Sequence, residues 1–144
     1  MKEQSYSNHR RYVTGYHFVL LFLSIIVLAG SIIFLFRSYR NGGERVISTV
    51  VFLGAINFLI IYYYTRSFAI AVQNRAIRAE ENLRHFILTG KLFDPGLSMS
   101  QIIALRFASD LEFPELANRA LAEKMSNDEI KKAIKNWKPD YHRA

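Results

Sequence analysis

Two long apolar runs without a charged residue dominate the first half of the chain, at residues 12–36 and 46–65. About 20 apolar residues in a helix cross the ~30 Å hydrocarbon core of a bilayer. The runs therefore predict transmembrane spans at about residues 16–36 and 46–65. The alternative, two buried helices of a soluble protein, needs a layer of protein around both helices, which 144 residues cannot supply.

A cleavable signal peptide is a second alternative for the first run, because Leu28-Ala29-Gly30-Ser31 resembles a processing site. The run is longer than the apolar region of about 7–15 residues that is typical of signal peptides, and it continues to Phe36. We therefore expect the first span to be retained.

A polar connection joins the two spans and contains Asn41-Gly42-Gly43, which favours a tight chain reversal. Residues 16–65 are therefore predicted to form an antiparallel helical hairpin. Lys and Arg beside spans favour the cytoplasmic side. More of them flank the outer ends of the hairpin than its connection, so residues 1–15 and both termini are expected in the cytoplasm. The outer residues are Lys2, Arg10, Arg11, Arg66, Arg75, Arg78 and Arg84, and those of the connection are Arg37, Arg40 and Arg45.

Aromatic and small residues refine this hairpin. Amphipathic rings settle at membrane interfaces, and the rings expected at the common end of both spans are Tyr16, Tyr62, Tyr63 and Tyr64. Small residues recur seven positions apart, Ser24 with Ser31 and Ser48 with Ala55. This spacing is typical of two helices that approach each other closely.

Asn57 lies inside the second span, where an amide needs a hydrogen-bond partner. Folding the chain about residue 41 brings Asn57 to the depth of Ser24. We therefore predict a polar contact between these two side chains across the hairpin. Contact of Asn57 with another subunit is the alternative.

The polar second half begins with a predicted juxtamembrane helix at residues 66–90, which is rich in alanine and ends at Gly90. Glu80 lies four positions before Arg84, and Glu81 lies three and four positions before Arg84 and His85, a spacing that predicts ion pairing along a solvated helix face. Glu81 and His85 alone are too few ligands to predict a metal site.

Residues 91–144 are predicted to form a small cytoplasmic subdomain of three short helices. After a turn at Asp94-Pro95-Gly96, a Ser precedes a Gln or Glu by three positions at three places, the pattern of a capping box at a helix start. These pairs are Ser98 with Gln101, Ser109 with Glu112 and Ser126 with Glu129. A unit this small needs support from the long helix, the membrane surface or a partner. The fold class is thus all-α: a transmembrane hairpin, a long helix and a three-helix subdomain.

The last of these helices is predicted to carry a basic face around a tryptophan, with Lys131, Lys132, Lys135, Trp137 and Lys138. Such a face is either solvated or docks on anionic lipid or on an acidic partner. Nucleic acid is not expected as a partner, because Asp128, Glu129 and Asp140 interrupt the positive field.

Signatures of catalysis are missing from the sequence. There is no cysteine, which excludes disulfides, thiolate metal sites and a cysteine nucleophile. There is also no glycine-rich phosphate loop, serine elbow or metal-ligand cluster. We therefore expect no catalytic residue, metal, cofactor or small-molecule substrate.

Three stretches of the second half resemble a known family: Gln73-Asn74-Arg75-Ala76-Ile77-Arg78-Ala79-Glu80-Glu81-Asn82-Leu83-Arg84-His85-Phe86, residues 101–110 and residues 129–137. The sequence resembles an uncharacterised family of small two-span bacterial inner-membrane proteins, a domain of unknown function. The resemblance implies this architecture and a bacterial cytoplasmic membrane, and it implies no activity or ligand.

The function expected from these observations is that of a non-enzymatic accessory or scaffolding component of a bacterial inner-membrane complex. Its partners would be membrane lipid and either another membrane protein or further copies of the chain. The alternative is a membrane-surface adaptor or regulator that binds anionic lipid or an acidic partner through the basic last helix.

Overall fold

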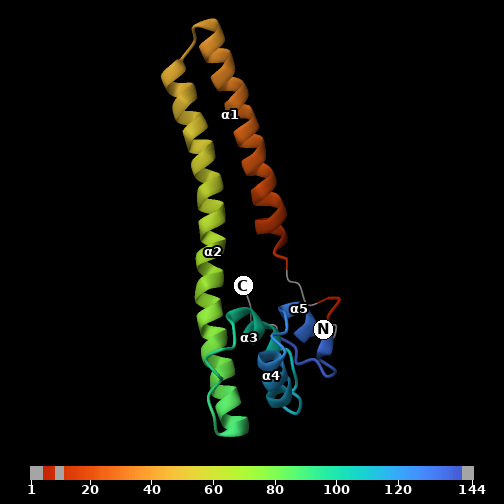
Figure 1. The fold of residues 1–144 in the computed structure, drawn as a ribbon. Helices are drawn as coiled ribbons and strands as arrows, with labels where there is room; N and C mark the ends of the chain where they lie inside the picture. The colour runs from red at the N-terminus through yellow and green to blue at the C-terminus, as the bar shows by residue number, and fades with distance from the viewer. Residues whose placement is uncertain (1–4, 9–11, 141–144) are drawn as a thin grey trace. The chain divides into compact units, whose positions relative to one another are not determined.

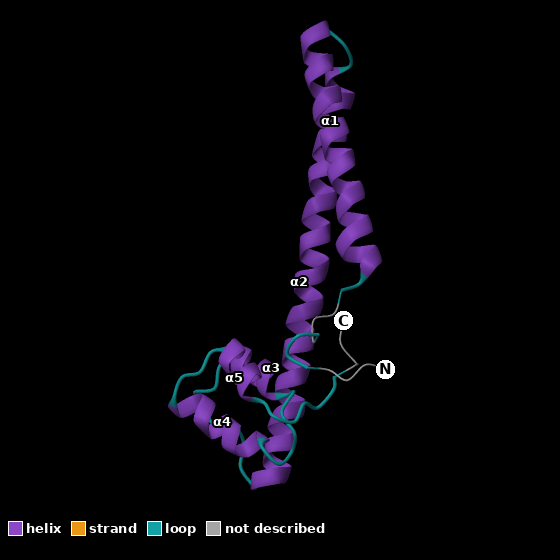
Figure 2. Cartoon of the chain, turned by 90° about the vertical axis from the view of Figure 1, so that its right-hand side faces the viewer, coloured by secondary structure: helices purple, strands orange, loops and turns teal. Residues whose placement is uncertain are grey.

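A computed structural model describes residues 5–8 and 12–140, and it confirms the all-α fold class (Figures 1 and 2). In these described residues, a π-helical stretch and five α-helices follow one another. They are η1 Gly15–Leu20, α1 Leu21–Asn41, α2 Arg45–Thr89, α3 Met99–Leu105, α4 Phe113–Ala122 and α5 Asn127–Ala133. The described residues fall into two compact units, which we name the hairpin unit (12–68) and the globular unit (5–8 and 69–140).

The hairpin unit pairs η1 and α1 with the first half of α2. Small side chains occupy the buried positions along this pairing: Ser24, Ser31, Ser38, Ser48 and Ala55. The hydroxyls of Ser24, Ser31 and Ser48 donate to carbonyls of their own helices, so they are satisfied without a partner across the interface. The predicted interface of small residues seven positions apart is therefore confirmed.

The reversal between α1 and α2 depends on glycine. Gly42 follows the last residue of α1 with φ 69°, in the left-handed region that residues with a side chain avoid. The N–H groups of Gly42 and Gly43 both donate to the carbonyl of Ser38, which satisfies an otherwise free helix end. The predicted turn at Asn41-Gly42-Gly43 is confirmed.

Helix α2 continues without a break through Thr65, so the second span and the juxtamembrane helix of the prediction are one element. Helix α2 ends at Thr89, and the residue after it is Gly90. Gly90 has φ 72°, and its N–H donates to the Phe86 carbonyl. This is a glycine C-terminal stop at the predicted place.

The globular unit has a core formed by α3, α4, α5 and one face of α2. Its fully or nearly buried apolar residues are Ile77, Leu97, Ile102, Ala104, Leu105, Phe107, Ala108, Phe113, Leu116, Ala117, Ala120, Ile130 and Ile134. Ile77 belongs to α2, so the three short helices rest on the long helix, one of the three supports that the sequence predicted.

The helix starts agree with two of the three predicted capping boxes. Ser98 and Gln101 form a complete box at α3, and Ser126 and Glu129 form one at α5. The third prediction is wrong in its detail, because α4 begins only after Glu112 and that residue has no side-chain cap bond. Pro114 lies in the first turn of α4, where backbone N–H groups have no acceptor within the helix, so the missing N–H of proline costs no hydrogen bond there.

A residue with strained backbone lies two positions after the end of α4. Lys124 has φ 50°, a left-handed conformation that favours glycine. The next N–H, from Met125, donates to the Ala120 carbonyl at 3.0 Å, as in a Schellman motif. The chain therefore uses lysine where helices commonly use glycine.

The prediction that the last helix extends through Trp137 and Lys138 is wrong. Helix α5 ends at Ala133, and Ile134 is extended and buried in the core. The following segment pairs with the end of α3 through a β-bridge between Ala108 and Trp137 and a 2.7 Å bond from the Lys138 N–H to the Phe107 carbonyl. These contacts compete with the helix, and the proline after Lys138 disfavours helical backbone at that residue.

Candidate protein-interaction site

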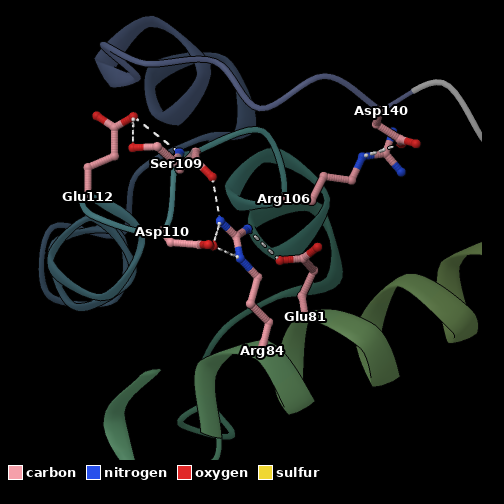
Figure 3. Close-up of polar contacts among 8 residues, drawn as sticks. Glu81, Arg84, Arg106, Ser109, Asp110, Glu112 and Asp140 are labelled. Carbon is pink, nitrogen blue, oxygen red and sulfur yellow. Dashed lines mark hydrogen bonds and ion pairs between the residues drawn. The ribbon is translucent and has the colours of Figure 1, made fainter. Parts of the chain in front are cut away.

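Arg84 forms the centre of a polar cluster that joins α2 to the loop after α3 (Figure 3). Its Nε donates to Asp110 Oδ1 at 2.7 Å, its Nη1 to Glu81 Oε2 at 3.0 Å and its Nη2 to the Ala108 carbonyl at 2.7 Å. The guanidinium also lies over the Phe113 ring, 4.2 Å from its centroid. The guanidinium therefore donates hydrogen bonds to oxygen atoms in its plane and makes a cation–π contact with a ring stacked on its face.

Burial in this cluster is unequal. The side chains of Arg84 and Glu81 are only 11% and 12% exposed, whereas that of Asp110 is 62% exposed. The hydrogen bond and charge of Arg84 lower the pKa of Asp110, against a smaller opposing effect of burial. Both carboxylates thus bond to a guanidinium that is largely buried. Removal of one partner from a buried ion pair leaves a charge without compensation and destabilises the fold.

These positions correct one expectation. The sequence placed Glu81, Arg84 and His85 on a solvated helix face, but Glu81 and His85 are both buried under the short helices. The predicted ion pairing does form, between Arg84 and Glu81. Periodicity alone could not identify this buried face, because the apolar Ile77 is followed on it by the polar Glu81 and His85, and other apolar residues of this part of α2 lie on another side.

Glu112 organises the other side of the same loop. Its carboxylate accepts from the hydroxyl and N–H of Ser109, at 3.2 and 3.3 Å, and from the N–H groups of Lys135 and Asn136, at 3.1 and 3.0 Å. Burial raises the pKa of Glu112, but the backbone donors outweigh burial and the pKa is lowered. Ser109 and Glu112 therefore do not cap a helix. Their hydrogen bonds fix the loop to the segment after α5.

Leu111 lies between the two braced carboxylates of Asp110 and Glu112. Its side chain is 94% exposed, although the loop on either side of it is held by Arg84 and by the segment after α5. Binding residues are often found on loops that a rigid scaffold holds in place. We name residues 109–112 the Leu111 loop.

The other buried polar groups of the globular unit hold its elements together. His85 Nδ1 lies 2.7 Å from the Lys91 carbonyl, and its ring lies against Phe93 at a centroid distance of 4.7 Å. Gln101 Nε2 donates to the Ala120 and Met125 carbonyls at 3.0 Å each. Among the residues that the structure describes, no three metal-binding side chains come together.

The predicted interface tyrosines lie at one end of the hairpin unit. The Tyr16 and Tyr62 rings stack with 4.6 Å between centroids, and the Tyr16 hydroxyl donates to the Tyr62 carbonyl. Tyr63 and Tyr64 are exposed and meet edge to face. The two helices are thus in register at this end, while the position of the rings in a membrane stays a prediction.

The predicted polar contact between Asn57 and Ser24 stays a prediction. The Ser24 hydroxyl donates to the Leu20 carbonyl at 2.8 Å, within its own helix. A serine that satisfies its donor locally gives close packing without a cross-helix bond. Contact of Asn57 with another subunit stays a prediction.

The predicted basic residues do not share a helix face. Lys131 and Lys132 belong to α5, whereas Lys135 and Lys138 follow its end. Lys132 lies 2.6 Å from Asp128, and Trp137 packs on Phe107 with 5.1 Å between ring centroids. Only two of the four lysines therefore lie on the helix, and docking of this segment on anionic lipid or an acidic partner stays a prediction.

The hairpin unit carries an open groove of about 540 Å³ near its turn. It is lined by Ile32, Leu35, Phe36, Tyr39, Thr49, Phe52 and Leu53. Its only polar side chains are Tyr39 and Thr49, whose hydroxyl oxygens lie 3.3 Å apart. The groove therefore offers an apolar surface and no group suited to acid–base chemistry near neutral pH.

Together, the elements define a helical hairpin protein with a small helical globular unit and a braced, exposed loop. The whole chain, residues 1–144, matches DUF6526, a family of unknown function, and the protein belongs to that family. The resemblance to a domain of unknown function is confirmed to this extent. Comparison with curated proteins and with solved structures gives no match.

Proposed function

We propose that this protein is a non-enzymatic accessory or scaffolding component of a bacterial inner-membrane complex. The hairpin unit anchors it, and the globular unit presents the Leu111 loop to a partner protein. The observation that carries the proposal is the 94% exposure of Leu111 between two carboxylates that are fixed by the globular unit. A preformed apolar contact loses little entropy on binding.

The membrane anchor is supported by the surface of the two long helices. Residues 15–41 and 45–89 are each long and apolar enough to span a membrane, and only 11% of the most apolar window of each is buried. A core helix of a soluble protein would be covered by protein instead. Lipid is the solvent that suits so much exposed apolar side chain.

The orientation with both ends on one side is supported by a contact inside the globular unit. The Tyr6 hydroxyl donates to Asp128 Oδ1 at 2.6 Å, and Lys132 Nζ lies 5.5 Å from the centroid of the Tyr6 ring. This contact joins the segment before the first span to α5, which requires both to be on the same side of a membrane. The greater number of Lys and Arg at these ends favours the cytoplasmic side.

The accessory role is supported by the use of the buried polar groups. Arg84, His85 and Gln101 each bond to a segment outside their own helix, and Glu81 bonds to Arg84. Groups that fix the fold in this way are occupied in the folded protein. They are therefore not free for chemistry, and the exposed Leu111 loop is the part of the globular unit that we propose for contact with a partner.

The test is co-purification of the full-length tagged protein from its native membranes in mild detergent, followed by mass spectrometry. We expect a stoichiometric partner that is lost with Leu111→Ser. Leu92→Ser is the matched control, because Leu92 is also an exposed leucine, at 64%, and lies outside the Leu111 loop. Equal recovery of the partner with both variants would contradict the proposed role of the loop.

A further inference from the structure

The globular unit leaves one apolar face of α2 uncovered. Val72, Ala76, Ala79, Leu83 and Phe86 follow one another at intervals of four, three, four and three residues, and all five are exposed. The exposed fractions of Val72, Leu83 and Phe86 are 70%, 59% and 49%. This is the spacing of the apolar positions in a coiled coil, and we name these five residues the α2 seam.

The α2 seam lies on the side of the helix opposite to the core. Successive residues turn by about 100° in an α-helix, which places Ile77, Glu81 and His85 on one face and the seam on the other. Ile77, Glu81 and His85 are the residues of α2 that the short helices bury. The packing of the globular unit therefore neither uses nor obstructs the seam.

Two exposed charges of opposite sign flank the α2 seam. Arg75 lies on one side of it and Glu80 on the other, and neither takes part in the ion pairs found among the described residues. In a parallel two-stranded coiled coil, each residue of the first flank faces the residue five positions later on the partner's second flank. Arg75 would thus face Glu80 of a second copy, twice by symmetry.

Antiparallel pairing does not give this match. It places the flank of Arg75 against the same flank of the other helix, whose other members are Asn82 and Thr89. That flank contains no acidic residue, so Arg75 would gain no opposite charge. The charges therefore select the parallel arrangement.

We propose that the α2 seam pairs with the same seam of a second copy of this chain, as a short parallel coiled coil. Ala76 and Ala79 let the two helices approach closely, while Val72, Leu83 and Phe86 supply the apolar area. The seam is short for a coiled coil in solution, but confinement of both copies to one membrane raises their effective concentration and orients them in parallel. This last step alone rests on the proposed membrane location.

Disulfide cross-linking in native membranes tests the proposal, because the chain contains no cysteine. Single variants Ala76→Cys, Ala79→Cys and Leu83→Cys should each give a cross-linked dimer on mild oxidation. Ala71→Cys is the matched control, since Ala71 is an exposed alanine of the same helix away from the seam. Equal cross-linking at Ala71 and Ala79, or cross-linking at none of the three seam positions, would overturn the proposal.

A charge exchange distinguishes this specific pairing from non-specific hydrophobic association of α2. In the Ala79→Cys background, Arg75→Glu alone and Glu80→Arg alone should each lower dimer yield about three-fold, because attraction becomes repulsion. The double variant should restore the yield. Failure of the double variant to restore it, or capture of a protein of different mass, would show that another partner covers the seam.

The result is independent of the proposed function. Leu111→Ser should leave cross-linking at Ala79→Cys unchanged, since Leu111 is not part of the seam. Conversely, the co-purification test compares Leu111→Ser with Leu92→Ser, and neither substitution changes the seam. Failure of one proposal therefore leaves the other one testable.

Discussion

The guanidinium of Arg84 and the carboxylate of Asp110 lie 2.6 Å apart, from Nη2 to Oδ1, although 26 residues separate them in the sequence. Arg84 is an inner residue of α2, whereas Asp110 begins the turn before α4. The same guanidinium bonds to Glu81 and to the Ala108 carbonyl. One side chain thus fixes both the attachment of the short helices to α2 and the position of the Leu111 loop.

Replacing Arg84 by methionine should destabilise the globular unit by about 3–5 kcal/mol, because the buried Glu81 loses the cation that compensates its charge. Denaturant unfolding in detergent, followed by the fluorescence of Trp137, measures this change. The double variant Arg84→Met with Glu81→Leu should recover most of the stability, since it removes both buried charges. Arg78→Met on an exposed part of α2 is the control and should change stability little.

Acid should weaken the globular unit through Glu112. Its pKa is lower in the folded protein than its ordinary value of 4.5. Its stabilising contribution is therefore complete above pH 4.5 and is lost as the pH falls below that value towards the lowered pKa. Glu112→Gln should be less stable near pH 7 and should show a flatter decline in stability between about pH 5 and 3. Parallel acid limbs for both proteins in chemical denaturation would contradict this assignment.

Gln101 should tolerate no apolar replacement, although it looks like an ordinary capping residue in the sequence. Its Nε2 bonds to the carbonyls of Ala120 and Met125, and its Oε1 accepts from the Ser98 N–H. Gln101→Met leaves these buried groups without partners and should cost about 2–4 kcal/mol. Thermal unfolding of this variant beside Ser100→Ala, an exposed neighbour, measures the difference.

Replacing Lys124 by glycine should stabilise the globular unit. Its φ of 50° strains a residue with a side chain, and glycine removes that strain. Lys124→Gly should therefore raise the stability of the globular unit by about 1 kcal/mol. Gly90→Ala supplies the reverse comparison, because it introduces a side chain at φ 72° and should lower stability by about the same amount. Equal effects of both changes in one direction would refute the role of the two C-terminal caps.

The hairpin should be sensitive to the volume of its buried serines. Ser31 is 3% exposed, so Ser31→Leu forces α1 and α2 apart and should lower the thermal stability of the protein in detergent by about 1–3 kcal/mol. Ile33→Leu is the control, because Ile33 is 56% exposed on the same helix. A hairpin that accepts leucine at position 31 as easily as at position 33 would show that close approach is unimportant.

Much of the fold could be predicted because its signals are local. Apolar runs, the Asn41-Gly42-Gly43 turn and the stop at Gly90 each depend on a few neighbouring residues, and the structure has them in place. Two capping boxes are equally local, and they mark the starts of α3 and α5. Such features need no knowledge of which segments meet.

The errors concern residues whose structure depends on distant partners. The helical pattern of the sequence continues from Ile134 to Trp137, but the helix ends at Ala133 and residues 136–138 pair with residues 107–109 instead. Ser109 and Glu112 match a capping box, but Glu112 bonds to Lys135 and Asn136 and takes another role. The buried charged face of α2 could not be recognised because burial of charge depends on the partners that surround it.

The bridge between Ala108 and Trp137 also has a consequence for motion. It joins segments 29 residues apart, whereas the helices it encloses are held by local bonds. Opening the chain at Trp137 and Lys138 alone breaks the bridge and the Lys138 bond but leaves Ile134 in the core, so it costs less than unfolding α3 or α4. The Lys138 amide, bonded to Phe107 at 2.7 Å, should exchange its hydrogen with solvent through this partial opening, ahead of the amides of the core helices.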